Sequence, residues 1–246
     1  MTMVFLLGGY DLEMLTVKQL LEEQNVAFYD AGLEWNNAKL SAYQEHFSNE
    51  QMFYGVELKE DCQLPQHYYR IDHHNDYSGK PSSLEQVAVI LGIELNRWQK
   101  LVAINDARYI PGMELLGATK EEVDSVRKAD RKAQGVTEKD ELNAEKAISK
   151  SLVIESVRVV RTSSSRFSPI VDRLYPTEKL LIYTDSELTY YGVGVDQVVE
   201  LFRTEIASQK AYFGGGSNGF FGLAKGCFSE EEIKMNVERI VKLVKE

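Results

Sequence analysis

The chain has 246 residues, of which 43% are hydrophobic, so it can bury a sizeable core as one large domain or two smaller ones. Its 38 acidic residues outnumber its 28 basic ones, and the formal net charge of -10 repels a phosphate backbone over most of the surface. This composition excludes a disordered chain and disfavours long nucleic acids as partners, but bound metal ions can reverse the field locally and admit a small phosphorylated ligand.

From residue 1 to about residue 118, short apolar stretches alternate with amphipathic ones. The first apolar run, Met3 to Leu7, is too short for a membrane span and predicts a buried strand. The expected strands are 4–7, 27–29, 53–58 and 68–71, and the expected helices are 12–24 and 84–91. Such alternation is typical of an α/β domain with a mostly parallel sheet, helices on both faces, and ligands at the carboxyl ends of the strands.

Residues 119–150 are highly charged and predict exposed connecting helices that are broken near Gly135. Strands are expected again at 152–160, 180–184 and 211–213, and helices at 196–208 and 229–245. Residues 151–246 therefore predict a second, smaller α+β domain.

The two cysteines, Cys62 and Cys227, are far apart and belong to no Cys-x-x-Cys or Cys/His cluster. We therefore expect neither a disulfide framework nor a structural zinc site, and a reducing, cytoplasmic setting.

The chain has only four histidines, and two of them are adjacent in Asp72-His73-His74. At a strand end, this tripeptide offers a carboxylate that orients its neighbours, one imidazole for a metal and another for a phosphate oxygen. The alternative is a surface turn that happens to contain two histidines.

The segment from Ile71 to Asp76, Ile-Asp-His-His-Asn-Asp, resembles the signature of the DHH phosphoesterase family, which includes RecJ-like and oligoribonuclease-like proteins. Members of this family open with a strand that ends in His-x-x-x-Asp-x-Asp. Here Leu7 stands at the histidine position and Glu13 replaces the second aspartate, while Asp11 is retained. The chain therefore resembles a divergent member of the family.

The resemblance implies metal ligands at Asp11, Glu13, Glu57, His73 and Asp106, with Asp61 and Asp30 as weaker candidates for the role of Glu57. Such an oxygen-rich set with one imidazole suits Mn²⁺ or Mg²⁺, and the family implies two ions. It also implies that His74 contacts the phosphate and that Asp72 assists it. The alternative for each carboxylate is a helix cap or a solvated loop residue.

A late glycine-rich segment contains Gly214, Gly215, Gly216, Ser217 and Asn218. Backbone N–H groups in such a segment can bind an anion closely. The segment resembles the Gly-Gly-Gly-His motif of the DHH-associated C-terminal domain, which implies substrate binding, with Ser217 in place of the histidine. The alternative is a tight turn.

Arg161 and Arg166 flank a run of hydroxyl side chains, Thr-Ser-Ser-Ser. Two guanidinium groups so placed could grip a phosphate. The alternative is an exposed polar loop.

The sequence thus predicts a divalent-metal-dependent phosphoesterase that hydrolyses a small nucleotide, a short oligonucleotide or another phosphorylated metabolite in the cleft between its domains. No membrane partner is expected, and a homodimer is compatible with the family. The alternative is a divergent, non-catalytic nucleotide-binding or phosphate-binding protein of the same fold. Leu7, Glu13 and Ser217 motivate that alternative, because each departs from the family pattern.

Overall fold

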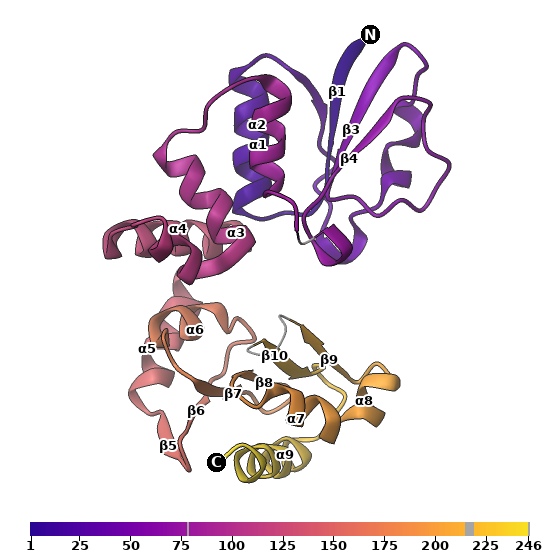
Figure 1. Ribbon diagram of the computed structural model, residues 1–246. Helices are drawn as coiled ribbons and strands as arrows, with labels where there is room; N and C mark the ends of the chain where they lie inside the picture. The colour runs from indigo at the N-terminus through magenta and orange to yellow at the C-terminus, as the bar shows by residue number, and fades with distance from the viewer. Residues whose placement is uncertain (78, 215–218, 246) are drawn as a thin grey trace. The chain divides into compact units, whose positions relative to one another are not determined.

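The computed structural model describes residues 1–77, 79–214 and 219–245. The chain divides into two compact units, Met1–Gly135 and Val136–Glu246 (Figure 1). The division falls within the predicted connector, at Gly135, which has a left-handed φ of 80°. As a result, α4 (Lys120–Ala133) belongs to unit 1 and α5 (Glu138–Ser149) belongs to unit 2.

Unit 1 is built on a four-stranded sheet with the order β2-β1-β3-β4. Its strands are β1 (Thr2–Leu7), β2 (Ala27–Tyr29), β3 (Gln51–Val56) and β4 (Tyr68–Ile71). Every pairing between them is parallel, which confirms the expected parallel sheet. All four carboxyl ends therefore lie at one edge of the sheet.

The two faces of this sheet carry helices of different kinds. On one face lie α1 (Leu12–Glu23) and α2 (Ser83–Leu91) (Figure 1). The other face carries the short 3-10 helices η1 (Trp35–Asn37) and η2 (Leu40–His46), in a cluster with strand residues such as Leu6 and Phe53. Helices thus cover both faces as expected, but those on the second face are short 3-10 helices.

Helix α3 (Arg97–Leu115) is interrupted at Tyr109, whose φ is 55°. Pro111 explains the break, because proline lacks an N–H donor and its ring clashes with the preceding turn. The next helix, α4, begins at a Thr119 capping box and has the four buried residues Val126, Arg127, Asp130 and Arg131.

A buried tyrosine joins the loop after β2 to the end of β1. The Tyr43 hydroxyl donates to the carbonyl oxygen of Leu7 at 2.5 Å and accepts from the N–H of Ala31 at 3.0 Å. The loop that carries η1 is therefore tied to the edge of the sheet where β1 ends.

Unit 2 is built on a six-stranded mixed sheet with the order β5-β6-β7-β8-β10-β9. Only β6 and β7 pair in parallel. The strands are β5 (Leu152–Ile154), β6 (Val157–Arg161), β7 (Lys179–Tyr183), β8 (Leu188–Gly192), β9 (Ala211–Gly214) and β10 (Phe220–Leu223).

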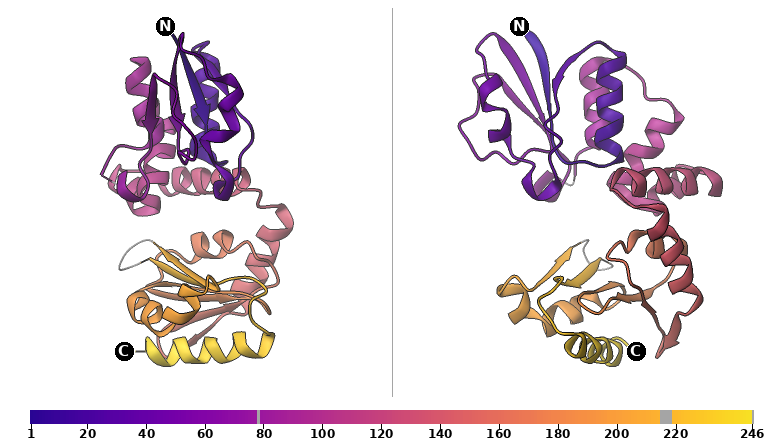
Figure 2. Two further views of the ribbon diagram at one scale, coloured as in Figure 1. Left: turned by 90° about the vertical axis from the view of Figure 1, so that its right-hand side faces the viewer. Right: turned by 180° about the vertical axis from the view of Figure 1, so that it is seen from behind.

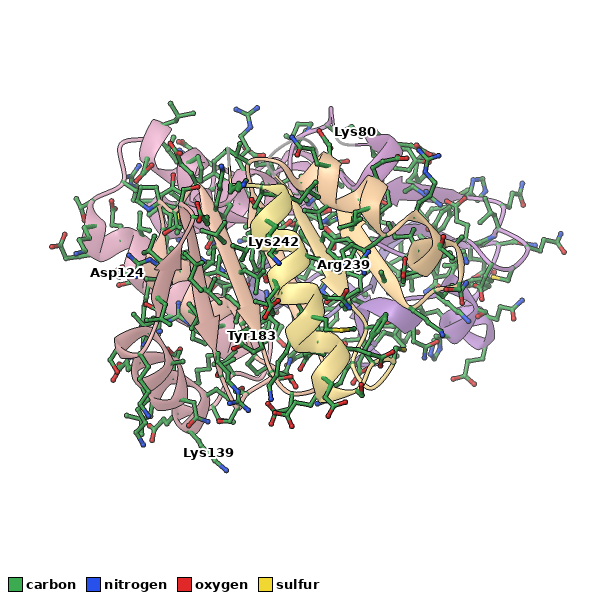
Figure 3. All side chains as sticks on the ribbon, turned by 90° about the horizontal axis from the view of Figure 1, so that it is seen from below. Lys80, Asp124, Lys139, Tyr183, Arg239 and Lys242 are labelled. Atoms are coloured by element: carbon green, nitrogen blue, oxygen red, sulfur yellow. The ribbon has the colours of Figure 1, made fainter. Side chains whose placement is uncertain are left out.

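Helices cover both faces of this second sheet (Figure 2). On one face, α7 (Val195–Leu201) and α9 (Glu230–Leu243) bury residues such as Val198 and Ile240 against the strands, and α8 (Arg203–Ala207) follows α7. Figure 3 shows α9 lying across the strands, with Arg239 and Lys242 labelled. On the other face, α5 and α6 (Ser168–Leu174) form a second cluster. The expected α+β architecture is confirmed.

Two sequence expectations for unit 2 are corrected by the structure. The single strand expected at 152–160 is a hairpin of β5 and β6, because Glu155 and Ser156 take left-handed φ values of 47° and 69°. The helix expected at 196–208 is divided at Phe202 into α7 and α8. Strands β8 and β10 were not predicted.

No helix among the described residues is long and apolar enough to cross a membrane.

We predict that Tyr43→Phe lowers the free energy of unfolding by about 1–3 kcal/mol, because it leaves the buried Leu7 carbonyl without its hydroxyl donor. Urea denaturation measures the change. Tyr54→Phe is the matched control, since the Tyr54 hydroxyl makes no hydrogen bond to any described residue. An equal loss of stability in both variants would contradict the anchoring role of Tyr43.

Candidate metal centre

The candidate site is formed by the residues that follow the parallel strands of unit 1. Strands β1, β3 and β4 end at Leu7, Val56 and Ile71. Glu57 and the Asp-His-His segment come directly after β3 and β4, and Asp11 follows β1 after a short loop, so all three emerge at the same edge of the sheet.

The backbone after β1, at Gly8, packs closely against the backbone after β3, at Glu57. A Cβ atom on Gly8 would lie 2.4 Å from the carbonyl oxygen of Val56 and 2.6 Å from that of Glu57, so only glycine fits there. Glu57 itself has a φ of 53°, which costs about 1–3 kcal/mol for a residue other than glycine. The turn after β3 is therefore strained at the position of a candidate ligand.

Two acidic residues at the start of α1 are held by backbone N–H groups. Asp11 caps the helix, since its Oδ1 accepts from the N–H of Met14 at 2.8 Å. Oε1 of Glu13 accepts from the N–H of Leu84, at the start of α2, at 3.1 Å. Both side chains are buried, and the second oxygen of Glu13 has no hydrogen-bond partner among the described residues.

The Asp-His-His segment follows β4 and leads into the 3-10 turn η3 (Asn75–Tyr77). Oδ1 of Asp72 accepts from the backbone N–H of His74 at 2.9 Å. In turn, Nε2 of Gln86 on α2 donates to the carbonyl oxygen of Asp72 at 3.2 Å. His73 is buried and His74 is half-buried. Asp72 thus fixes the backbone that presents both imidazoles.

Asp106 lies in α3, one turn before the break at Tyr109. Its neighbour Asn105 is buried and accepts from Nη1 of Arg127 at 2.9 Å. The same Nη1 donates to Asp130 at 2.7 Å. Helix α4 therefore supports the part of α3 that presents Asp106.

The carboxylates converge on one imidazole. Nε2 of His73 lies 2.8 Å from Oδ2 of Asp106, 3.3 Å from Oε2 of Glu13 and 3.4 Å from Oε1 of Glu57. These four atoms are buried, and none of them makes a well-directed hydrogen bond to a described residue. Buried polar atoms in native structures are normally paired. Atoms that meet at short distance without such bonds are arranged as ligands around a cation would be.

One ligand atom from each of Glu57, His73, His74 and Asp106 lies within 4.8 Å of the others. Two carboxylates and two imidazoles are a donor set that can hold a divalent transition metal. The structure therefore brings His74, which the sequence placed at the phosphate, into the group of possible ligands. Glu13 contacts the group through His73, and Leu7 is a buried core residue that offers no ligand.

Burial and mutual repulsion make this site electrostatically unusual. Burial, with the nearby carboxylates of Asp106 and Glu57, raises the pKa of Asp11 to about 9. Burial likewise raises the pKa of Glu13 to about 8. Burial lowers the pKa of His73, but the adjacent carboxylates outweigh it and raise that pKa to about 12. Among the described residues, no lysine or arginine forms an ion pair with Asp11, Glu13, Glu57 or Asp106.

The substrate-binding candidates of unit 2 are placed differently. The exposed Arg161 pairs with Asp185 at 2.6 Å and with Glu230 at 3.4 Å. Arg166 is exposed, and its backbone N–H donates to Ser164. Gly214 ends β9, opposite Phe220 of β10. Gly215, Gly216, Ser217 and Asn218 lie outside the described residues.

Sequence reasoning missed the residues beside the metal centre, which include Trp35, Lys59, Arg70 and Tyr77. They line a pocket that also includes Glu57 and His74. The available signal was weak: Trp35 is one of only two tryptophans, and it stands in a polar loop.

Neither the protein-family models nor the curated proteins contain a match to this chain. Among solved structures, the DHH domain of a member of the s1p family of ribosomal proteins aligns over 98% of this chain and 87% of its own length, with 10% identity and a TM-score of 0.53. The chain has a divergent DHH-family fold.

Two RecJ structures are also similar, with TM-scores of 0.47. RecJ of Thermus thermophilus in complex with Mn²⁺ is 13% identical, and the alignment covers 98% of this chain and 52% of that protein. An exonuclease RecJ bound to manganese is 12% identical, with 98% and 90% of the two chains covered.

We predict that Gly8→Ala weakens Mn²⁺ binding by at least about tenfold, because the added methyl group must displace the backbone that carries Glu57. Titration calorimetry measures the affinity. Gly79→Ala is the control, since a Cβ atom there would meet nothing within 4 Å. Unchanged affinity in Gly8→Ala would show that this close approach does not position the ligands.

A second prediction concerns pH. The pKa values of Asp11 and Glu13 are raised from 3.8 to about 9 and from 4.5 to about 8, so the folded state holds protons that the unfolded state has released. The metal-free protein should therefore lose stability as the pH rises through this interval. Urea unfolding in a chelating buffer, from about pH 5.5 to about pH 8.5, tests this. The slope should flatten in Asp11→Asn/Glu13→Gln, and a slope of the opposite sign would refute the assignment.

Proposed function

We propose that this protein is a divalent-metal-dependent phosphoesterase whose reaction centre is the cluster at the sheet edge of unit 1. The observation that carries the proposal is the convergence of buried, unpaired carboxylate and imidazole atoms within hydrogen-bonding distance of one another. Three carboxylates, those of Glu13, Glu57 and Asp106, surround the single imidazole of His73, so the acids outnumber the basic group among them and the site favours additional bound positive charge.

Glu57, His73, His74 and Asp106 would hold one divalent ion. Asp11 and Glu13 are the carboxylates available to a second ion. Four carboxylates and two imidazoles suit Mn²⁺ better than Mg²⁺, because imidazole nitrogen is a softer donor than carboxylate oxygen. Bound divalent cations neutralise the charge of a phosphate and lower the pKa of an attacking water.

The protein's own groups have distinct tasks in this proposal. His74 is more exposed than His73, with 38% against 5% of its side chain accessible, so it is the imidazole that can also meet a substrate. Asp72 holds the His74 backbone through its N–H and thereby orients the ring. The backbone anchors of Asp11 and Glu13 each use one carboxylate oxygen and fix the direction of the other.

The substrate we propose is a small nucleotide, a short oligonucleotide or another phosphorylated metabolite. Two observations support a small ligand. The net charge of -10 opposes a long polyanion, and the pocket beside the centre has a volume of about 460 Å³, within the range usual for small-molecule sites.

The alternative is a phosphate-binding protein of the same fold without catalysis. Leu7 favours it, because this residue is buried in the core and offers no ligand. The engagement of one Glu13 oxygen by the Leu84 N–H also limits how that carboxylate can bind an ion.

Metal titration and turnover distinguish these functions. We predict that the protein binds Mn²⁺ in titration calorimetry and hydrolyses bis-p-nitrophenyl phosphate. His73→Ala and Asp106→Asn should each reduce turnover by at least about a hundredfold, since loss of outer-shell partners alone costs about 10- to 100-fold.

His67→Ala is the control for this experiment, because His67 lies just before β4, at the opposite end of that strand from His73. Absence of binding at millimolar Mn²⁺ would exclude the metal-dependent enzyme and favour the phosphate-binding protein. Metal binding without hydrolysis of any phosphoester would also favour the alternative.

A further inference from the structure

A pocket of about 460 Å³ adjoins the candidate metal centre within unit 1. It shares Glu57 and His74 with the centre, and Trp35 and Tyr77 contribute aromatic rings to its lining. Arg70 lies in β4, and the other lining residues come from the segments that follow β2, β3 and β4. A group held in this pocket would therefore lie next to a phosphate bound at the centre.

The ring of Trp35 is positioned by the backbone beneath it. A Cβ atom on Gly9 would come within 2.6 Å of that ring, so the indole packs directly on the glycine. The ring also meets His74 edge-on, with centroids 5.3 Å apart and planes at 73°. Trp35 is nevertheless 47% exposed, which leaves indole surface free for a ligand.

A second aromatic residue, Tyr77, is held by Arg70. The guanidinium lies 5.0 Å from the centre of the Tyr77 ring, and its Nη1 donates to the Tyr77 hydroxyl at 3.0 Å. Its Nε donates to Glu60 at 2.8 Å. The remaining nitrogen, Nη2, makes no hydrogen bond to a described residue and is an available donor.

Two further polar groups of the pocket are also available. Neither Lys59 nor Asp76 has an ion-pair or hydrogen-bonded side-chain partner in the part of the chain that the structure describes. Because Arg70 and Lys80 lie over the Tyr77 ring, the free aromatic surface of the pocket is the indole of Trp35, which is accompanied by free donors and a free acceptor. Proteins read an unstacked nucleobase with this combination, by stacking on the ring and hydrogen bonding to its edge.

We propose that this pocket binds the base of a nucleotide whose phosphate lies at the metal centre. The proposal rests on the phosphoesterase function and narrows its substrate class to nucleoside phosphates. A second phosphate fits the pocket less well, because three carboxylates line it, and Glu60 already neutralises Arg70. One base, rather than a run of bases, matches the volume.

Tryptophan fluorescence tests the proposal directly. The chain has two tryptophans, so Trp98→Phe leaves Trp35 as the sole reporter. Trp98 lies on α3, is 41% exposed and does not line the pocket. With Mn²⁺ present, adenosine 5′-monophosphate should quench Trp35 and bind at least about tenfold more tightly than ribose 5-phosphate, the same ligand without a base.

Two variants locate the effect. In Trp35→Ala, adenosine 5′-monophosphate should bind no more tightly than ribose 5-phosphate. Gly9→Ala should reduce the preference in the same way, because its methyl group would displace the indole from beneath. Circular dichroism checks that both variants are folded. Loss of the nucleotide preference in both Trp35→Ala and Gly9→Ala would not be explained by misfolding of one variant.

Failure of this proposal and failure of the proposed function give different results. Equal affinity for the two ligands, or an undiminished base preference in Trp35→Ala, overturns the base pocket even if Mn²⁺-dependent hydrolysis is found. If Trp35 responds to the nucleotide but no phosphoester is hydrolysed, the pocket stands and the enzyme does not.

Discussion

The constraint on which unit 1 depends is the burial of several carboxylates at one edge of a parallel sheet. Asp11, Glu13, Glu57 and Asp106 repel one another there, and the imidazole of His73 is the cationic group that the described chain places among them. Burying unpaired charge is among the most costly things a protein can do. In the proposed function, a bound cation would offset this cost.

The scaffold holds the acids mainly with backbone groups. The N–H groups of Met14 and Leu84 each engage one carboxylate oxygen, and Asp72 engages the N–H of His74. Because backbone donors carry no formal charge, they orient the acids without neutralising them. The side-chain support from Arg127 is directed to Asn105 and Asp130, beside the centre rather than within it. The acids therefore stay available to a cation, as the proposed function requires.

Local patterns in the sequence were sufficient for the sheet and for the histidine pair. The alternation of apolar and amphipathic segments predicts β1 to β4 correctly, and Asp72-His73-His74 stands out because histidine is scarce. The hairpin of β5 and β6 was missed because Glu155 and Ser156, rather than glycine or proline, form its turn. Turns are predicted from residue types that favour them, and tertiary contacts can impose a turn on other residues.

The sequence alone does not show which loops lie close together in the folded protein. Gly8 and Gly9 are visible as a pair, but their partners, the Val56 carbonyl and the Trp35 ring, are far away in the chain. The pocket beside the metal centre has the same origin, since its residues Trp35, Lys59 and Tyr77 belong to three segments that are separate in the chain.

The left-handed conformation of Glu57 lowers the stability of the folded chain, and so does the buried side chain of Glu13. Glycine in place of Glu57 would relieve the backbone strain, and an apolar residue at position 13 would relieve a buried charge. A lineage with no use for the site could therefore gain stability by discarding it, and mutational drift would have open routes to do so. The chain carries the less stable residue at both positions, and the proposed metal centre accounts for this, because both side chains lie against His73 in that centre.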